Sequence, residues 1–442
     1  MKSTMSPRSV VRLPGGGAAT GLDEDPRVED SVPAALRVIV SHPAKQGNVY
    51  HRPRAAEIAG MDVRFLTGLY FRPARFPYFL LPWLPRTLRG RLMQLLEKRK
   101  IDRLDDDSVV SLLGPSLELA LRPTGRFREW GNAHDWLASW WIATHRRSST
   151  PTILHGFQGS CVRTFRAGRS KGMIRVLEMT LPPILDTALL GGVAGEPGDP
   201  QASELAAEIK EADFILAQSE YSARTAIVLG AHEEQIVRVH LGVDTSCFRP
   251  REHERMPGPV RVLFLGGTSR RKGIHHLLEA WGTGGIPGAE LSIAGNRTSG
   301  WDAPAIEDFA NCRLVGFIPE NRFTIALQNA DILVNPSLSE GGSNVIYEAL
   351  ACGLPCIVSS NAGSAVRNGI EGFVVGVGDV PALRSAMQGL CLDSPLRERM
   401  GRAARGRAES LSWDRYAENL AVVYRRLARP SKAREFCLNS RF

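Results

Sequence analysis

Residues 336–360 have the sequence PSLSEGGSNVIYEALACGLPCIVSS, in which two carboxylates, Glu340 and Glu348, stand eight positions apart around a glycine-rich helix start. The apolar run before this stretch predicts a strand over 331–337. Residues 344–352 are predicted to form a helix that the following Gly-Leu-Pro ends, and a second buried strand comes next. Strand, loop, helix and strand predict a βαβ unit of an α/β fold with parallel sheets.

The glycine-rich loop at the start of this helix is a candidate anion site. Gly341, Gly342 and Ser343 stand where backbone amides and the positive end of the helix dipole would face a phosphate. Glu348 lies about 6 Å further along the helix at 1.5 Å per residue, and Glu340 precedes the loop. Carboxylates only accept hydrogen bonds, so these two are expected to bind hydroxyl groups on either side of the phosphate. The arrangement predicts a nucleotide sugar, whose ribose and hexose flank a diphosphate.

The composition indicates a globular chain with two domains. At 442 residues the chain is too long for one core, and it suits two domains of about 200 residues. The net charge of +9 and the pI near 9.4 indicate attraction to anionic partners, a class that includes nucleotides, nucleic acid and phospholipid surfaces. Seven cysteines without a CxxC pair indicate reduced thiols in a cytosolic protein and no metal site.

The two ends of the chain are predicted to have no fold of their own. Residues 1–34 combine PGGG with an acidic DEDPRVED cluster and have no apolar core, which is typical of a disordered leader and not of a signal peptide. The tail, 429–442, is expected to be frayed. No run approaches the roughly 20 apolar residues of a membrane span.

The first domain is predicted over 35–249. Its opening run, LRVIVSHP, is β-branched and ends in proline, as expected of a central strand of a parallel sheet. A helix over 54–59 and a strand over 62–70 complete a βαβ opening. His155 lies in a further strand and loop, 151–160, beside two glycines. It is either a structural histidine or a side chain that points into a cleft and meets a sugar hydroxyl.

A basic and aromatic segment interrupts the first domain. Residues 71–100, FRPARFPYFLLPWLPRTLRGRLMQLLEKRK, carry eight Arg or Lys residues, and Glu97 is the only acid among them. Cations beside aromatic side chains are typical of a peripheral contact with an anionic membrane. The alternative is an inter-domain or core-capping excursion followed by a solvated basic helix.

A polar linker over 250–259 leads to a second domain, predicted over 260–410. Its first strand, VRVLFLGG, runs into TSRRKG and a helix, so Arg270, Arg271 and Lys272 crowd a helix N-terminus. Three cations there oppose the helix dipole, and a bound diphosphate would compensate them. The alternative is a solvated basic turn.

The strands of the second domain have glycines near their ends. Loops of this kind let a base and a ribose approach the backbone closely. The residues predicted to line that approach are Gly266, Gly267, Gly295 and Phe317. An amphipathic helix within 411–428 follows this domain.

Four segments together resemble the retaining family 4, or group 1, glycosyltransferases of bacterial type: FLGGTSRRKGIHHLLEAW, ADILVNPSLSEGGSNVIYEALACGLPCIVSS, EGFVVGVGD and VHLGVDTSCFRP. The resemblance covers about 36–427. It implies a GT-B fold, in which two Rossmann-like parallel-sheet domains face a central cleft and the last helix crosses back to the first domain. It also implies hinges near 249–259 and 411–413, where the two domains close on the donor.

The resemblance also implies roles for individual residues. Glu348 would bind the donor ribose, Glu340 the hexose hydroxyls and Lys272 the diphosphate. Family members commonly have an arginine five residues before that lysine, and this chain has Gly267 there, so Arg271 or Arg270 is the candidate substitute. The first strand lacks the family's glycine pair, so no acceptor contacts carry over. The catalytic candidates are Lys272, Glu340, Arg271 and His155, and the donor-binding candidates are Glu348, Gly341, Gly342, Ser343, Asn344, Gly266, Gly267, Arg270, Gly295 and Phe317.

The predicted activity is transfer of a sugar from a UDP- or GDP-linked donor to a glycan or lipid-linked acceptor, in cell-surface polysaccharide or glycolipid synthesis. The family chemistry implies neither metal nor cofactor, because cations and helix amides stabilise the departing diphosphate. Nucleic acid is not an expected partner. The predicted location is the cytoplasm, peripherally on the inner face of the membrane through 71–100. The alternatives are an epimerase or phosphorylase on the same fold and a non-catalytic nucleotide-sugar-binding scaffold.

Overall fold

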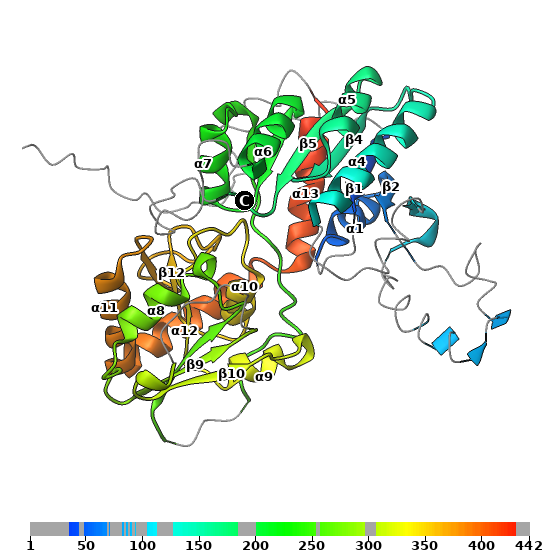
Figure 1. Ribbon diagram of the computed structural model, residues 1–442. Helices are drawn as coiled ribbons and strands as arrows, with labels where there is room; N and C mark the ends of the chain where they lie inside the picture. Colours follow the sequence, from blue (N-terminus) through cyan, green and yellow to red (C-terminus); the bar gives the residue numbers. More distant parts are fainter. Residues whose placement is uncertain are drawn as a thin grey trace, which may run out of the picture. The chain divides into compact units, whose positions relative to one another are not determined.

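Two parallel β-sheets carry the fold in a computed structural model (Figure 1). The structure describes residues 35–43, 48–68, 70, 104–112, 127–183, 200–252, 257–296 and 306–429, together with isolated positions between 82 and 93. The predicted leader 1–34 and almost all of the tail lie outside the described residues, as does most of the basic segment 71–100. No helix among the described residues is long and apolar enough to cross a bilayer.

The first sheet has seven strands in the order β3-β2-β1-β4-β5-β6-β7, and all neighbouring strands are parallel. The strands are β1 (Arg37–His42), β2 (Asp62–Thr67), β3 (Val109–Ser111), β4 (Thr152–Phe157), β5 (Ile174–Met179), β6 (Phe214–Ala217) and β7 (Ile236–Arg238). The α-helices among the described residues of this half are α1 (His51–Ile58), α4 (Phe127–Thr144), α5 (Val162–Ser170), α6 (Pro200–Glu211) and α7 (Glu220–Val228).

The second sheet has six strands in the order β10-β9-β8-β11-β12-β13, also parallel. The strands are β8 (Val260–Leu265), β9 (Ala289–Ala294), β10 (Cys312–Gly316), β11 (Ile332–Asn335), β12 (Cys356–Ser359) and β13 (Gly372–Val375). The helices of this half are α8 (Ile274–Trp281), α9 (Phe323–Gln328), α10 (Asn344–Ala351), α11 (Val380–Leu392) and α12 (Ser394–Glu409).

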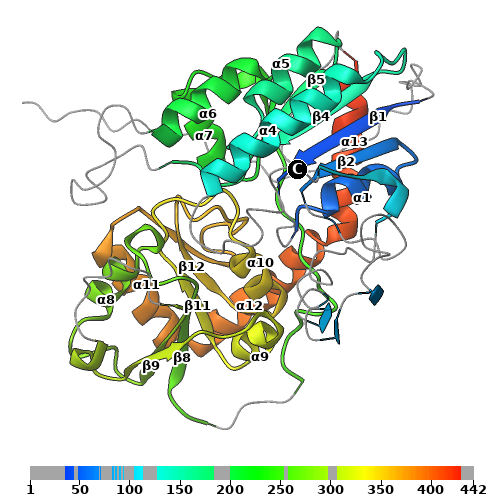
Figure 2. The ribbon, with the colours of Figure 1, turned by 45° about the vertical axis from the view of Figure 1, so that its right-hand side comes forward.

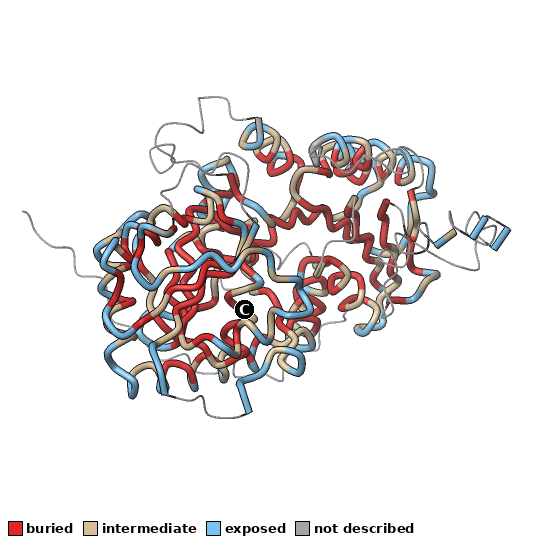
Figure 3. The backbone as a smooth tube through the Cα atoms, turned by 60° about the horizontal axis from the view of Figure 1, so that its bottom comes forward, coloured by how far each residue is buried: buried red, intermediate tan, exposed pale blue. Residues whose placement is uncertain are grey.

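The central strands of each sheet are buried on both faces, which explains why they are apolar runs without polar alternation, whereas the edge strand β10 is mostly exposed. In β1, Val38 and Val40 join the core under α1, whereas Ile39 joins the core under α4 and α5. In β8, Leu263 packs toward α10 and Phe264 toward α8. Figure 3 shows the buried strands of the two sheets as continuous red runs of the tube. The predicted α/β architecture with two Rossmann-like parallel sheets is confirmed.

The last helix, α13 (Trp413–Leu427), follows the second sheet in sequence but packs on the first. Its residues Leu420 and Val423 belong to the core of the first sheet, and α13 lies beside α1 (Figures 1 and 2). The ring of Trp413 stacks on His51 with the centroids 3.5 Å apart and the planes within 4°. A helix from the end of the chain therefore completes the core of the first sheet.

The strand order reverses direction once in each sheet. In the second sheet β8 lies between β9 and β11, so the connections leaving β8 and β11 run to opposite sides. Ligands of open parallel sheets bind at the carboxyl ends of the strands where the order reverses. The loops after β8 and β11 contain the two motifs that the sequence singled out, so the topology brings these motifs to one place.

Candidate active site

Two loops meet at the carboxyl edge of the second sheet. The amide of Leu338 donates to the carbonyl of Arg271 at 2.8 Å, which joins the β11–α10 loop to the turn before α8. Gly273 in that turn has a φ of +68° and lies against the carbonyl of Pro336, where a Cβ would overlap the oxygen. Glycine is required at this position both for its positive φ and for the close approach.

Lys272 and Glu340 form an ion pair across these loops, with Lys272 Nζ 2.6 Å from Glu340 Oε1. Glu340 is buried and Lys272 is partly buried. The two residues are 68 positions apart in the sequence, and the reversal of strand order brings them together. The site therefore has a cation and a hydroxyl-accepting carboxylate in direct contact.

Arg271 holds the loop that contains Glu340. Its guanidinium donates from Nε and Nη2 to the carbonyl of Ser339 at 3.0 and 2.9 Å. Burial lowers the pKa of Arg271, while Glu340 and Tyr221 raise it. Arg271 stays cationic, because arginine is not deprotonated in proteins. Arg270 is exposed. Of the three clustered cations, Lys272 contacts Glu340, and Arg271 holds the loop that contains Glu340.

The predicted phosphate cradle is partly occupied by the protein itself. The amide of Ser343 donates to the carbonyl of Gly363 at 3.1 Å, and its hydroxyl accepts from Asn335 Nδ2 at 3.1 Å. Asn344 is exposed, and its Oδ1 accepts from Asn48 Nδ2 at 2.9 Å. The prediction that the Ser343 amide faces a ligand therefore needs correction, because Gly363 accepts its hydrogen bond. Gly363, Asn335 and Asn48 carry no motif that would have identified them.

Gly341 and Gly342 lie where the second half of the chain touches the first. A Cβ at Gly341 would overlap the carbonyl oxygen of Thr180, which follows β5. A Cβ at Gly342 would lie 2.6 Å from Gln218 Oε1, directly after β6, and 2.6 Å from Leu241 Cδ1. Neither glycine has a positive φ. Glycine is therefore required at both positions because the neighbouring atoms leave no room for a Cβ, and not because of the backbone conformation.

Gly341→Ala should destabilise the protein by about 1–3 kcal/mol, because the methyl group forces the loop away from Thr180. The displaced loop contains Glu340, so nucleotide-sugar turnover should also fall by on the order of tenfold or more. Gly406→Ala, in an open position on α12, is the matched control. Thermal unfolding and turnover measured side by side check the prediction, and equal behaviour of the two variants would contradict it.

The other predicted donor contacts line the same edge of the sheet. Glu348 on α10 is partly buried, and its buried Oε2 has no hydrogen-bond partner among the described residues. Burial, with a smaller contribution from Glu320, raises the pKa of Glu348 to about 7. A Cβ at Gly295 would overlap the carbonyl of Gly266, so the ends of β9 and β8 are in contact. Gly267 faces open space, and Phe317 is 67% exposed at the end of β10.

His155 does not lie at this site. It lies on the same face of β4 as Ile153 and Phe157, the face of the first sheet that α13 covers, and it is fully buried. Its Nδ1 lies 2.6 Å from the hydroxyl of Tyr424 on α13, and its Nε2 lies 3.0 Å from Glu178 Oε2. The expectation that it points into a cleft is corrected, because the partner that buries it comes from 269 positions later in the chain.

Glu178 is the centre of this buried polar network. Arg52 donates to it from Nε at 3.0 Å and from Nη2, and Gln218 Nε2 donates to it at 2.6 Å. Burial alone would raise the pKa of Glu178, but the charge of Arg52 and the hydrogen bonds from His155 and Arg52 outweigh it and hold the pKa well below its usual range. The network joins α1, β4, β5, β6 and α13.

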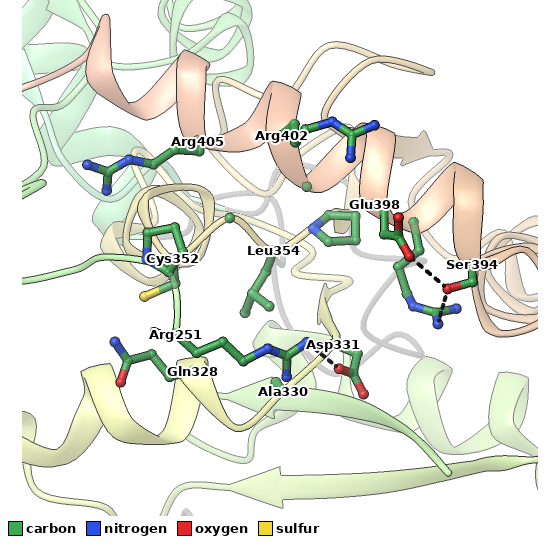
Figure 4. A pocket seen from close by; sticks show the side chains of 15 residues that line it. Arg251, Gln328, Ala330, Asp331, Cys352, Leu354, Ser394, Glu398, Arg402 and Arg405 are labelled. Carbon is green, nitrogen blue, oxygen red and sulfur yellow. Dashed lines mark hydrogen bonds and ion pairs between the residues drawn. The ribbon is translucent and has the colours of Figure 1, made fainter. Parts of the chain in front are cut away.

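A cavity of about 520 Å³ lies at the opposite edge of the second sheet, where β11 and β12 begin (Figure 4). Arg251 pairs there with Asp331 at 3.2 Å, and Arg405 donates to the carbonyls of Thr245, Phe248 and Ala351. These contacts tie the segment that leaves the first half to α10 and α12. The cavity is separate from the Lys272–Glu340 site, and Arg251 and Arg405 bind carboxylate and carbonyl groups of the chain itself.

The chain is similar to known glycosyltransferases in sequence. Residues 259–393 match the family model for glycosyl transferases group 1. The D-inositol 3-phosphate glycosyltransferase of Mycobacterium avium (strain 104) is 30% identical over 270 residues, which are 57% of this chain and 63% of that protein. The chain thus spans less than two thirds of the curated relatives it matches. The relative from Mycobacterium bovis (strain BCG / Pasteur 1173P2) is 31% identical over 268 residues, which are 56% of this chain and 55% of the relative.

Solved structures share the fold. Sucrose-phosphate synthase from Thermosynechococcus elongatus superposes with a TM-score of 0.59 at 19% identity, over 89% of this chain and 99% of that one. Anabaena Alr3699/HepE, in complex with UDP and glucose, superposes with a TM-score of 0.56 at 14% identity, over 88% and 98%. These neighbours confirm the predicted GT-B fold, and residues 259–393 are the part of the chain that matches the group 1 glycosyl transferases.

Proposed function

We propose that this protein is a retaining, metal-independent glycosyltransferase that moves a sugar from a nucleotide-sugar donor to a glycan or lipid-linked acceptor. The observation that carries the proposal is the contact between Lys272 and Glu340 at the carboxyl edge of the second sheet. A cation next to a carboxylate matches the two ends of such a donor: the diphosphate needs positive charge and the sugar hydroxyls need an acceptor.

The pair gives each residue a role in transfer. Lys272 exchanges Glu340 for the diphosphate when a donor binds, and it stabilises the charge that develops on the leaving phosphate. Glu340 is then available to accept hydrogen bonds from the hexose, and Glu348 from the ribose. The acceptor hydroxyl attacks the face of the sugar that the leaving group vacates, with a phosphate oxygen taking its proton. Arg271 acts by holding the Ser339 carbonyl, which keeps Glu340 in place.

UDP is the first donor nucleotide to test. The structural neighbour Alr3699/HepE is described as a complex with UDP-glucose, and a variant of TarM from S. aureus as a complex with UDP and α-GlcNAc-glycerol. Both share the fold of this chain. We assign the protein to polysaccharide or glycolipid synthesis at the inner face of the cell membrane, with 71–100 as a candidate membrane contact. Residues 35–249 are proposed to bind the acceptor and 260–410 the donor.

A panel of UDP- and GDP-sugars, each assayed for release of the nucleoside diphosphate with and without glycan and lipid-linked acceptors, tests the proposal. Acceptor-dependent release supports a transferase. Conversion of the donor without any acceptor, or only with inorganic phosphate, would instead identify an epimerase or a phosphorylase on the same fold. Calorimetry that detects no nucleoside diphosphate binding would point to a scaffold and would overturn the proposal.

The affinity for UDP-glucose should rise with pH between about pH 6 and pH 8, because Glu348, with a pKa of about 7, accepts hydrogen bonds best as a carboxylate. Glu348 affects the stability of the fold in the opposite direction. Its pKa in the folded protein lies above the ordinary value of 4.5, so its contribution to the free energy of unfolding is fully present below pH 4.5 and is lost as the pH rises through about 7. Calorimetry on the wild type and Glu348→Gln checks this prediction, and an equal pH slope in both proteins would contradict it.

A further inference from the structure

The outer face of α4 exposes two tryptophans. Trp136 is 52% exposed and Trp140 is 59% exposed, and they are four residues apart on one face of the helix. The opposite face holds the residues that pack on the first sheet, such as Ala138 and Ile142, which are fully buried. Packing of the helix is therefore complete without the two tryptophans.

These exposed indoles have no intramolecular explanation among the described residues. In the described part of the chain, no ring contact involves Trp136 or Trp140, whereas the neighbouring Trp141 stacks on His145 with the centroids 3.7 Å apart. Large apolar side chains gathered on one face of a soluble helix indicate an interaction surface. Tryptophan is also suited to a membrane interface, because its ring is apolar and its N–H is polar.

Cations surround the end of the same helix. Arg146 and Arg147 follow the end of α4 after His145 and are exposed, and in the described part of the chain neither is ion-paired. Lys171 Nζ donates to the carbonyl of His145 at 2.9 Å, which brings a third cation to this end. Cations at a helix C-terminus also interact favourably with the helix dipole. The dipole does not account for the two exposed tryptophans on the same helix.

The acids near this face do not neutralise it. Asp135, on α4 itself, is buried and accepts the amides of Arg163 and Thr164 at the start of α5. Glu211 on α6 pairs with the arginines of α5, and Glu129 lies in the first turn of α4, at the far end from the cations. The outer face of α4 and the turn that follows it therefore carry exposed aromatic side chains and cations that no acid among the described residues pairs with.

We propose that the outer face of α4 binds an anionic phospholipid surface, with Trp136 and Trp140 at headgroup depth and Arg146, Arg147 and Lys171 on the lipid phosphates. Charge complementarity selects this occupant, because three cations beside an aromatic pair match an anionic interface. The inference does not depend on sugar transfer. It adds to the proposed function a membrane contact built from residues other than 71–100.

Flotation of the full-length protein with vesicles of phosphatidylcholine, with or without phosphatidylglycerol, tests the proposal. The wild type should float with the anionic vesicles at low salt and not with phosphatidylcholine alone. Trp136→Ala/Trp140→Ala should lower the vesicle partition coefficient by on the order of tenfold. Arg146→Ala/Arg147→Ala should lower it by about fivefold for each charge removed, because each cation near the surface adds a similar increment.

The matched control is Ile227→Ala/Val228→Ala, which removes two exposed apolar side chains from α7 and should leave flotation unchanged. Trp83→Ala, in the basic segment, separates the two candidate contacts. The proposal is overturned if the α4 tryptophan variant floats like the wild type, or if Trp83→Ala alone abolishes flotation. It is also overturned if the tryptophan variant changes only the oligomeric state on gel filtration, which would identify a protein interface.

Release of nucleoside diphosphate by the same variants, measured without vesicles, keeps this inference apart from the proposed function. The α4 variants should release it at the wild-type rate, because no contact among the described residues links Trp136, Trp140, Arg146 or Arg147 to Lys272 or Glu340. A protein that floats but transfers no sugar would contradict the proposed function alone. A protein that transfers sugar but does not float would contradict the α4 proposal alone.

Discussion

Lys272→Ala should lower nucleotide-sugar turnover by on the order of 10²- to 10³-fold, because the variant lacks the cation that stabilises the leaving diphosphate. Glu340→Ala should cause a loss of similar size by removing the acceptor for the hexose hydroxyls. The two residues lie 2.6 Å apart, so their effects should not be additive, and the double variant should resemble the worse single variant.

Steady-state release of nucleoside diphosphate from UDP-glucose, or from the donor that the panel identifies, measures this loss. Lys210→Ala, which removes an exposed lysine from α6, is the control for a general effect of lost charge. Thermal unfolding of each variant separates lost chemistry from lost folding. Full turnover in both Lys272→Ala and Glu340→Ala would refute the site assignment.

Arg52→Met should destabilise the protein by about 3–5 kcal/mol, the largest stability loss we expect from a single substitution. Arg52 and Glu178 are both buried, and the guanidinium makes two hydrogen bonds to the carboxylate. Removing the cation leaves Glu178 charged and buried, with Gln218 and His155 as its remaining partners among the described residues. The double variant Arg52→Met/Glu178→Met should recover much of the loss, because no unpaired charge remains.

Chemical denaturation of the single and double variants measures these free energies. Arg64→Met, which removes a partly exposed pair with Asp62 at 3.3 Å, is the matched control and should cost no more than about 1 kcal/mol. The folded pKa of Glu178 is depressed, so its contribution to stability is present above 4.5 and is lost as the pH falls toward the folded value. The acid sensitivity should therefore shrink in the double variant. If the Arg52→Met variant has the same free energy of unfolding as the Arg64→Met variant, the role assigned to the network is refuted.

Much of the fold could be predicted from local pattern. The run LRVIVSHP corresponds to β1, and the predicted strand at 62–70 corresponds to β2 with a shorter carboxyl end. The first helix was expected from 54 but begins at His51, because Pro53 is tolerated in the first turn of a helix, where its missing amide costs no hydrogen bond. Local pattern thus identified the elements better than their ends.

The individual roles of site residues were less predictable. The glycines at 341 and 342 fit a phosphate loop by sequence, but their lack of side chains also lets the loop pack on Thr180 and Gln218. In the sequence Arg271 is equivalent to Arg270 and Lys272 as a candidate ligand of the diphosphate. Its hydrogen bonds to the carbonyl of Ser339 give it a different role from Lys272. These distinctions depend on partners far away in the sequence.

The sequence by itself determined the alternation of strands and helices and the local chemistry of each loop, because apolar periodicity, helix caps and the spacing of Glu340 and Glu348 act within a few residues of one another. Only the tertiary structure decided that Lys272 meets Glu340 and that α13 buries His155. The physical reason is that strand order and the docking of the last helix set these contacts, and both depend on packing between segments that no local pattern connects.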